Sequence, residues 1–379
     1  MKTVCFVNTH YFPTLGGIVR YTKNLSLELQ KKGVNTMMVT LNVSGLSEHE
    51  VVDGMEIYRL PCINFMDGRF PVIKPDKRCR EILREVKKKE IDLMIINARF
   101  YVLSLFMAGF AKRNKTRAMV IDHGSSHLTM SSFFMTKLGE CYEHLATGIL
   151  KLFCKEFYGV SKASCQWLAH FGIEAKGVLY NAVDLKEIMA VQEIQGRDLK
   201  KEFGLPKSAI IVAYTGRLVV EKGILPLMES VEQLNRKYPE LYLFIAGDGP
   251  LKEEILQKKS PNVILLGQVE LEEIIFLLRQ SRILCLPSAS EGFPTSVLEA
   301  VACKCFVAAT KIGGAVEIIP TKEYGILLEE NDVFHIKEAI EYALREDVKV
   351  ATEKSYQRMM ENFTWEKTSQ KVYEILMKE

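Results

Sequence analysis

The sequence predicts an α/β protein made of two Rossmann-like domains, and three observations lead to this prediction. Short apolar runs alternate with helix-like segments from one end of the chain to the other. The 379 residues exceed what a single hydrophobic core usually organises, so two domains are expected. A polar, charged stretch at residues 192–201 separates two series of apolar runs. Because ligands of open α/β sheets bind beyond the carboxyl ends of the strands, function is expected in the loops that follow strands.

The first series of elements lies in residues 1–184. An apolar run at residues 4–7 predicts a buried strand, and a loop containing Gly16-Gly17 follows it. Apolar periodicity then predicts an amphipathic helix over residues 18–32, with Gly33 where a helix C-cap belongs. Further buried strands of a parallel, doubly wound sheet are expected at residues 37–40, 93–96, 119–121 and 177–179.

The second series begins after Asp184 and predicts a second parallel sheet. Helical patterns, such as residues 225–238 and 271–279, separate its β-rich runs. The strands are expected at residues 210–214, 241–246, 263–266, 283–286 and 306–309.

Composition and charge exclude several classes of protein. The longest nearly apolar run, residues 101–111, is shorter than the ~18 residues of a membrane-spanning helix. Nine cysteines without a CxxC pair favour a reducing cytoplasm over a disulfide framework or a cysteine zinc site. Residues 1–185 carry 25 Lys and Arg against 17 Asp and Glu, so the net charge of +3 is unevenly distributed. The densest basic stretch, residues 74–89, is expected to be a solvated helix face, and no nucleic-acid-binding motif accompanies it.

The loop after the first expected strand ends in Gly16-Gly17, directly before a helix. Glycine lets backbone N–H groups approach an anion closely, and the helix N-terminus adds a favourable electric field. The spacing is not that of the GxGxxG dinucleotide fingerprint. This loop therefore predicts either an anion site or a plain glycine turn.

The loop at residues 214–223 carries two cations, Arg217 and Lys222, between a strand and a helix. Arginine engages phosphate oxygens through a bidentate fork, whereas lysine acts as a point charge. The two side chains together suit a diphosphate. The alternative is a pair of exposed basic residues without a ligand.

The loop and helix at residues 288–300 contain two carboxylates, Glu291 and Glu299. Glu291 precedes the helix, where it can reach a sugar hydroxyl or be a surface carboxylate. Glu299 lies one turn into the helix, where it can accept hydrogen bonds from ribose or compensate the helix dipole. Between the two carboxylates, Gly292 and Pro294 are expected to shape the turn. Thr295 or Ser296 is expected to cap the helix.

In order and character these loops resemble the motifs of the retaining glycosyltransferases of family four, which have the GT-B fold. The resemblance covers essentially the whole chain, and its most specific element is the Glu-x7-Glu pair around Gly292-Phe293-Pro294. Three more segments match in order: Gly216-Arg217-Leu218 with Glu221-Lys222-Gly223, Gly247-Asp248-Gly249-Pro250, and Gly313-Gly314-Ala315-Val316-Glu317. Two positions depart from the family pattern, since Ala182 stands where glycine is usual and Asp122 precedes His123 where a small or hydroxyl residue is usual.

The resemblance implies a domain arrangement and a role for each matching residue. Residues 1–184 would form the acceptor domain and residues 185–360 the nucleotide-sugar donor domain, facing it across a cleft, while residues 361–379 would form a helix crossing back to the first domain. The implied catalytic residues are His123, Arg217, Lys222 and Glu291, with Arg217 and Lys222 on the donor diphosphate. The implied donor-binding residues are Gly16, Gly17, Gly216, Gly267, Gln268, Gly292, Phe293, Pro294, Thr295, Leu298 and Glu299.

The implied activity is retaining transfer of a hexose from a nucleotide-sugar, with a UDP-sugar as the expected donor, to a glycan or lipid-linked acceptor in surface polysaccharide biosynthesis. No Asp-x-Asp motif is present, so neither a divalent metal nor another cofactor is expected. The alternatives are a non-catalytic nucleotide-sugar-binding subunit, or a GT-B epimerase or phosphorylase. Residues 130–157 combine aromatic, apolar and lysine side chains, which suit either peripheral docking on the inner face of an anionic membrane or a buried helix.

Overall fold

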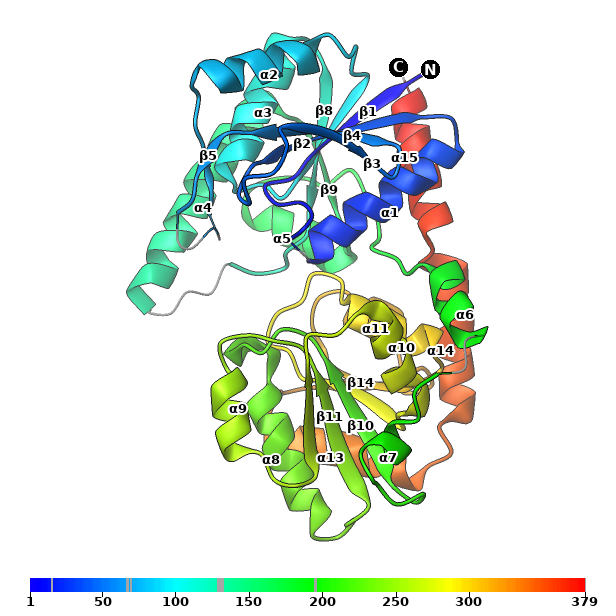
Figure 1. Cartoon of the computed structure of the whole chain (residues 1–379). Helices are drawn as coiled ribbons and strands as arrows, with labels where there is room; N and C mark the ends of the chain where they lie inside the picture. The colour runs from blue at the N-terminus through cyan, green and yellow to red at the C-terminus, as the bar shows by residue number, and fades with distance from the viewer. Residues whose placement is uncertain (15, 66–67, 69, 128–132, 194–195, 379) are drawn as a thin grey trace. The chain divides into compact units, whose positions relative to one another are not determined.

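The computed structural model describes residues 1–14, 16–65, 68, 70–127, 133–193 and 196–378. The chain divides into two compact units, each with its own sheet and helices (Figure 1). The first unit comprises Met1–Asn181 together with Trp365–Glu379, and the second comprises Ala182–Thr364. The C-terminal helix therefore belongs to the first unit. The acceptor and donor roles assigned to the two parts of the chain stay predictions.

The first unit contains a seven-stranded sheet in the order β3-β4-β2-β1-β7-β8-β9, which is parallel except for β3. Strands β5 and β6 form a separate two-stranded antiparallel sheet. The bounds of these strands are β1 Thr3–Val7, β2 Asn35–Leu41, β3 His49–Val52, β4 Met55–Leu60, β5 Cys62–Ile63, β6 Val72–Ile73, β7 Leu93–Asn97, β8 Arg117–Asp122 and β9 Glu156–Gly159. Its helices are α1 Gly17–Lys31, α2 Lys77–Lys87, α3 Val102–Arg113, α4 Phe133–Phe153, α5 Lys162–His170 and α15 Trp365–Met377.

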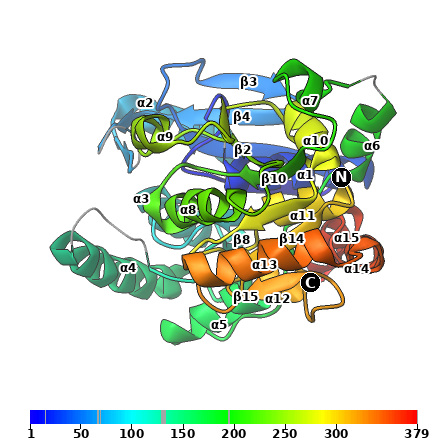
Figure 2. The ribbon, with the colours of Figure 1, turned by 90° about the horizontal axis from the view of Figure 1, so that it is seen from below.

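The second unit contains a fully parallel six-stranded sheet in the order β12-β11-β10-β13-β14-β15. Its strands are β10 Ile210–Thr215, β11 Leu241–Ala246, β12 Val263–Gly267, β13 Ile283–Leu286, β14 Phe306–Thr310 and β15 Ile326–Leu328. Its helices are α6 Leu185–Glu193, α7 Leu199–Glu202, η1 Val220–Lys222, α8 Ile224–Asn235, α9 Lys252–Lys258, α10 Leu271–Gln280, α11 Thr295–Ala302, α12 Ala315–Ile318, α13 Val333–Arg345 and α14 Lys349–Asn362. Helices α8 and α13 pack against each other and against the sheet (Figure 2).

Both sheets are doubly wound, and each has one point at which the strand order reverses. In the second unit the chain runs outward from β10 to β12, returns through α10, and runs outward again from β13 to β15. The reversal therefore lies between β10 and β13. In the first unit the corresponding reversal lies between β1 and β7. Such switch points are where open α/β sheets bind ligands, because the loops on either side diverge there.

Central strands are the elements that the apolar runs predicted most closely. Strands buried on both faces read as continuous apolar runs, as in β11 and β13, whose observed bounds equal the predicted ones. One predicted strand, residues 177–179, is wrong, since only Val178 pairs with Gly159 in an isolated bridge.

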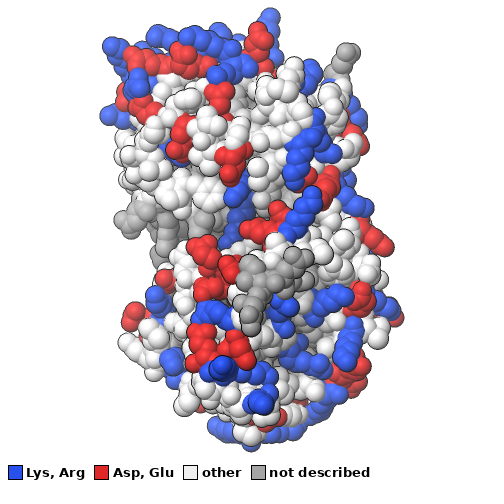
Figure 3. Space-filling view, turned by 45° about the vertical axis from the view of Figure 1, so that its right-hand side comes forward, with Lys and Arg blue, Asp and Glu red and all other residues white. Residues whose placement is uncertain are grey.

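The basic stretch at residues 74–89 includes the N-cap residue Asp76, helix α2 and the turn after the helix. One face of the helix is buried through Cys79, Ile82, Leu83 and Val86, and its basic side chains are exposed. Arg78 pairs with Glu81 at 3.0 Å, and acidic side chains are interspersed with the basic ones on this end of the unit (Figure 3). The predicted solvated helix face is therefore observed. Among the described residues, no helix combines the length and the apolar character needed to cross a membrane.

Candidate functional site

The carboxyl edge of the second sheet gathers the loops that carry most of the predicted site residues. The backbone N–H of Gly216 donates to Ala246 O at 3.0 Å, and that of Gly247 donates to Gly267 O at 2.7 Å. These bonds join the segments that follow β10, β11 and β12. The N–H of Gly314 donates to Gly292 O at 2.9 Å, which joins the segments after β13 and β14. The loops therefore form one connected surface at the edge where parallel-sheet proteins bind ligands.

Two glycines allow these loops to approach one another closely. Gly313 has a φ of +52°, and a Cβ at this position would lie 1.9 Å from Glu291 O. A Cβ on Gly247 would lie 1.8 Å from Gly216 O. Both distances are far below van der Waals contact, so only glycine permits this packing. Gly313 and Gly247 thus help to set the positions of Glu291 and Gly216.

Lys222 and Glu291 meet across the switch point. Lys222 ends the short η1 helix after β10, and Glu291 lies in the loop after β13. Lys222 Nζ lies 2.5 Å from Glu291 Oε1, and their side chains are 23% and 13% exposed. The N–H of Ala289 donates to Glu221 O at 2.7 Å and holds the two loops together. Arg217, the second predicted cation, is exposed two residues after β10. The pairing of Lys222 with Glu291 was not predicted from the sequence.

The helix after β13 corrects one prediction about its start. Helix α11 begins at Thr295 with Pro294 at the N-cap position, and no side chain in the described part of the chain caps it. The predicted cap by Thr295 or Ser296 is therefore wrong. Proline has no N–H and a fixed φ, which suits it to a helix start without a side-chain cap. The uncapped helix start leaves backbone N–H groups that an anion can use.

The other predicted donor-binding residues differ in their exposure to solvent. Gln268 is exposed directly after β12, and Gly267 ends that strand with a φ of +77°. Glu299 is 7% exposed one turn into α11. Leu298 is fully buried, so any ligand contact from it would come from its backbone. Phe293 is buried, and its ring packs against Phe363 with centroids 5.2 Å apart.

In the first unit, Gly16 and Gly17 lie at the start of α1. Gly16 is the N-cap in an extended conformation, and among the described residues no side chain caps the helix. Apart from the chain neighbours, no atom of the described residues lies within 4 Å of a Cβ placed on either glycine. The first turn of α1 carries no acidic residue that would repel an anion. Leu15, in the same loop, lies outside the described residues.

His123 follows β8 and joins a polar network at the carboxyl ends of three adjacent strands. Its Nε2 lies 2.8 Å from Asn97 Oδ1 at the end of β7, and Asn97 Nδ2 donates to Asn8 Oδ1 after β1 at 2.8 Å. Because Asn97 Oδ1 is thereby an acceptor, His123 donates from Nε2 and keeps Nδ1 as an acceptor. Burial lowers the pKa of His123 to about 3, so the ring is neutral at physiological pH.

Asn8 and Asn97 are site residues that the sequence analysis missed. Both are buried and stand at the switch point between β1 and β7. The available signal was that each is a polar side chain directly after, or at the end of, an apolar strand.

Asp122, before His123, is buried and paired with Arg99 at 3.1 Å, and burial raises its pKa to about 6. The Asp122 carboxylate is thus engaged in an ion pair with Arg99.

Comparison with known proteins places these features in a family context. A family model described as Glycosyltransferase Family 4 matches residues 15–217, and one described as Glycosyl transferases group 1 matches residues 196–364. The Bacillus subtilis teichuronic acid biosynthesis protein TuaC is 28% identical over 302 residues, covering 77% of this chain and 72% of the relative. The GPI3 component of the Saccharomyces cerevisiae phosphatidylinositol N-acetylglucosaminyltransferase is 23% identical over 349 residues, covering 88% of this chain and 73% of the relative.

Solved structures show the fold over nearly the whole chain. A sucrose-phosphate synthase from Thermosynechococcus elongatus has a TM-score of 0.78 and 19% identity, covering 99% of this chain and 98% of that structure. The Anabaena protein HepE, solved in complex with UDP-glucose, has a TM-score of 0.75 and 16% identity, covering 99% of both chains. These likenesses confirm the predicted fold class, the two Rossmann-like units of the GT-B fold.

Proposed function

Because the chain belongs to glycosyltransferase family 4, we propose that it transfers a hexose from a UDP-sugar to a glycan or lipid-linked acceptor with retention of anomeric configuration. The supporting observation is the meeting of Lys222 and Glu291 at the switch point of the second sheet. A cation and a sugar-binding carboxylate at one switch point suit a phosphate joined to a sugar.

The donor diphosphate is proposed to bind Arg217, Lys222 and the uncapped start of α11. The Lys222 ammonium has three N–H donors, so it can keep Glu291 and still donate to phosphate oxygens. When the bond between the sugar and the diphosphate breaks, negative charge develops on the leaving phosphate. Fixed cations and helix N–H groups stabilise that charge without rearrangement. These groups do the electrostatic work that a divalent metal does in other transferases, so we propose that no metal is needed for this step.

His123 is proposed to act as a neutral hydrogen-bonding group on the first unit. Its lowered pKa rules out a general acid that is protonated at pH 7. Nε2 is engaged by Asn97, so Nδ1 is the atom that can accept a hydrogen bond from a sugar hydroxyl. The acceptor hydroxyl gives its proton to the departing phosphate in the proposed attack from the leaving-group face.

A lipid-linked acceptor is supported by the surface of α4. Four apolar side chains with helical spacing are each more than half exposed on this helix: Phe134 at 76%, Leu138 at 56%, Leu145 at 65% and Leu152 at 63%. An exposed apolar stripe on an amphipathic helix suits the interface of a membrane. We propose peripheral binding at the cytoplasmic face. Leu145→Glu is expected to reduce co-sedimentation with anionic vesicles at low salt, and binding equal to that of the parent protein would contradict membrane docking.

The test of the donor site is calorimetric titration with UDP, GDP and ADP, with and without Mg²⁺. UDP is expected to bind without metal, and Lys222→Ala is expected to weaken binding. Lys237→Ala is the matched control, because it removes an exposed lysine of the same unit, whose ion-pair partner is Glu341 at 2.8 Å. Its UDP affinity is expected to equal that of the parent protein.

The outcomes separate the proposal from its alternatives. Tighter binding of GDP or ADP than of UDP would overturn the choice of donor base. Failure of the folded protein to bind any nucleotide would overturn the donor site itself. Binding with neither transfer nor hydrolysis of the donor would favour a non-catalytic nucleotide-sugar-binding subunit. Conversion of the free sugar to its epimer would favour a GT-B epimerase.

A further inference from the structure

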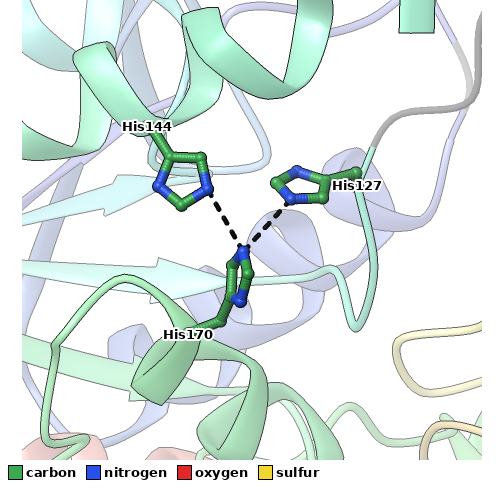
Figure 4. Close-up of side chains that lie close together, drawn as sticks. All are labelled: His127, His144 and His170. Carbon is green, nitrogen blue, oxygen red and sulfur yellow. Dashed lines mark hydrogen bonds between the residues drawn. The ribbon is translucent and has the colours of Figure 1, made fainter. Parts of the chain in front are cut away.

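Three histidines from separate segments of the first unit turn their imidazole rings toward one another (Figure 4). His127 follows β8, His144 lies on α4, and His170 ends α5. Nε2 of His170 lies 3.3 Å from Nε2 of His127 and 3.2 Å from Nε2 of His144. One nitrogen of each ring lies within 4.8 Å of the other two. The sequence analysis did not identify this cluster, because its members lie 17 and 26 residues apart in the chain.

Hydrogen bonds among the three rings cannot satisfy both close contacts of His170 Nε2. A neutral imidazole Nε2 carries either one proton or one lone pair, so it cannot donate to one neighbour and accept from another. His170 Nε2 has two nitrogen neighbours at hydrogen-bond distance and can form a full bond with only one of them. A cation placed among the rings would instead use a lone pair from each histidine.

Two of the three separations match those between ligands of one tetrahedral ion, and the remaining pair of ring nitrogens lies within 4.8 Å. With Zn–N bonds of about 2.0–2.1 Å, two ligand nitrogens of a tetrahedral site lie about 3.3–3.4 Å apart. The two Nε2 separations at His170 are 3.3 and 3.2 Å. Imidazole nitrogen is the ligand type that zinc, nickel and copper share. Two of the three rings, His144 and His170, are exposed, so an ion can reach the cluster from solvent.

A buried carboxylate lies behind the cluster. Glu143 Oε1 lies 3.4 Å from the other ring nitrogen, Nδ1, of His127, at ion-pair distance but without a hydrogen bond between the two atoms. Metal-binding histidines commonly have a carboxylate at this second nitrogen, which orients the ring. Glu143 also pairs with Arg99, which pairs with Asp122. Two carboxylates against one guanidinium leave a net charge of −1 when both are ionised, which favours a cation nearby.

We propose that His127, His144 and His170 bind one divalent transition-metal ion of the zinc type through their Nε2 atoms, with Glu143 as a positioning residue. The ion would tie α4 and α5 to the segment after β8. That segment also carries His123, four residues before His127. The metal would therefore hold the loop of the predicted active-site histidine, and its role is structural. The proposal does not depend on the proposed diphosphate site at Arg217 and Lys222, which are residues of the second unit.

The test measures metal binding by tag-free full-length protein that has been stripped with a chelator and dialysed against Zn²⁺. About one ion per chain is expected, as is a rise in Tm of about 5 °C at a hundredfold excess over Kd. His144→Ala and His170→Ala are expected to lower zinc affinity at least about tenfold. Both side chains are exposed, so the variants are expected to fold, which circular dichroism checks. His335→Ala is the matched control, because His335 pairs with Asp332 outside the cluster.

A second readout uses the ring that stacks on the cluster. Trp167 lies parallel to His170, with centroids 4.8 Å apart and an interplanar angle of 6°. Bound Cu²⁺ is expected to quench the emission of Trp167, and Trp167→Phe is expected to abolish that quenching. Zinc content in the parent protein no higher than in His144→Ala would overturn the proposal. Equal affinity in the parent, His144→Ala and His170→Ala would overturn it as well.

Discussion

The acid sensitivity of the first unit should depend on His123. Burial lowers the pKa of this side chain to about 3, whereas an unfolded histidine titrates near 6.5. Below pH 6.5 the unfolded chain therefore binds a proton that the folded unit does not bind. The free energy of unfolding consequently falls as the pH decreases. Between pH 7 and pH 5 this linkage costs about 2 kcal/mol.

Titration of Asp122 changes the free energy of unfolding in the opposite direction as the pH falls. The contribution of His123 must therefore be measured against a variant that lacks this histidine. Burial raises its pKa to about 6, so lowering the pH through 6 removes the cost of its buried charge and stabilises the folded unit. His123→Gln separates the two effects. Glutamine can still donate a hydrogen bond to Asn97 Oδ1, which lies 2.8 Å from the histidine Nε2, but it does not titrate. The wild type is expected to lose about 2 kcal/mol more than the variant between pH 7 and pH 5.

The assay is urea unfolding followed by tryptophan emission, with a chelator present to keep metal out. The chain has two tryptophans, Trp167 and Trp365, and both lie in the first unit. The signal therefore reports the unit that carries His123, even if the two units unfold separately. A parallel loss of stability in the wild type and His123→Gln would refute the reasoning, because it would mean that His123 keeps an ordinary pKa in the folded state.

Three further predictions concern the second unit. Lys222→Ala is expected to lower the transfer rate at least about 10²-fold with the fold intact, because it removes a fixed cation from the leaving group; a wild-type rate would exclude that role. Glu299→Ala should weaken UDP binding by about 1.5–3 kcal/mol in calorimetry, and an unchanged Kd would count against ribose binding. Gly313→Ala should destabilise the unit by more than about 2 kcal/mol in denaturant, since its Cβ would collide with Glu291 O. Gly204→Ala, also at positive φ but with open space around it, should cost only about 1 kcal/mol, and equal losses would contradict the steric argument.

Local pattern predicted the parts of the fold that depend on local physics. Strands buried on both faces need apolar side chains at every position, so β11 and β13 could be located from composition alone. Strands β3, β4, β5, β6, β9 and β15 were not predicted. In β4, Glu56 and a buried Arg59 interrupt the apolar side chains. That arginine is tolerated because it pairs with Glu50 of β3, a partner that sequence reading does not supply.

The candidate site likewise has features that the sequence predicted and contacts that only the tertiary structure shows. The order of motifs, with Arg217 and Lys222 after one strand and Glu291 after another, was visible in the sequence and predicted the family. The contact between Lys222 and Glu291 was not visible, because they lie 69 residues apart and meet only through the strand order at the switch point. The histidine cluster likewise joins three segments. Propensity and periodicity act over a few residues, whereas such contacts arise only when the sheet brings distant loops to one edge.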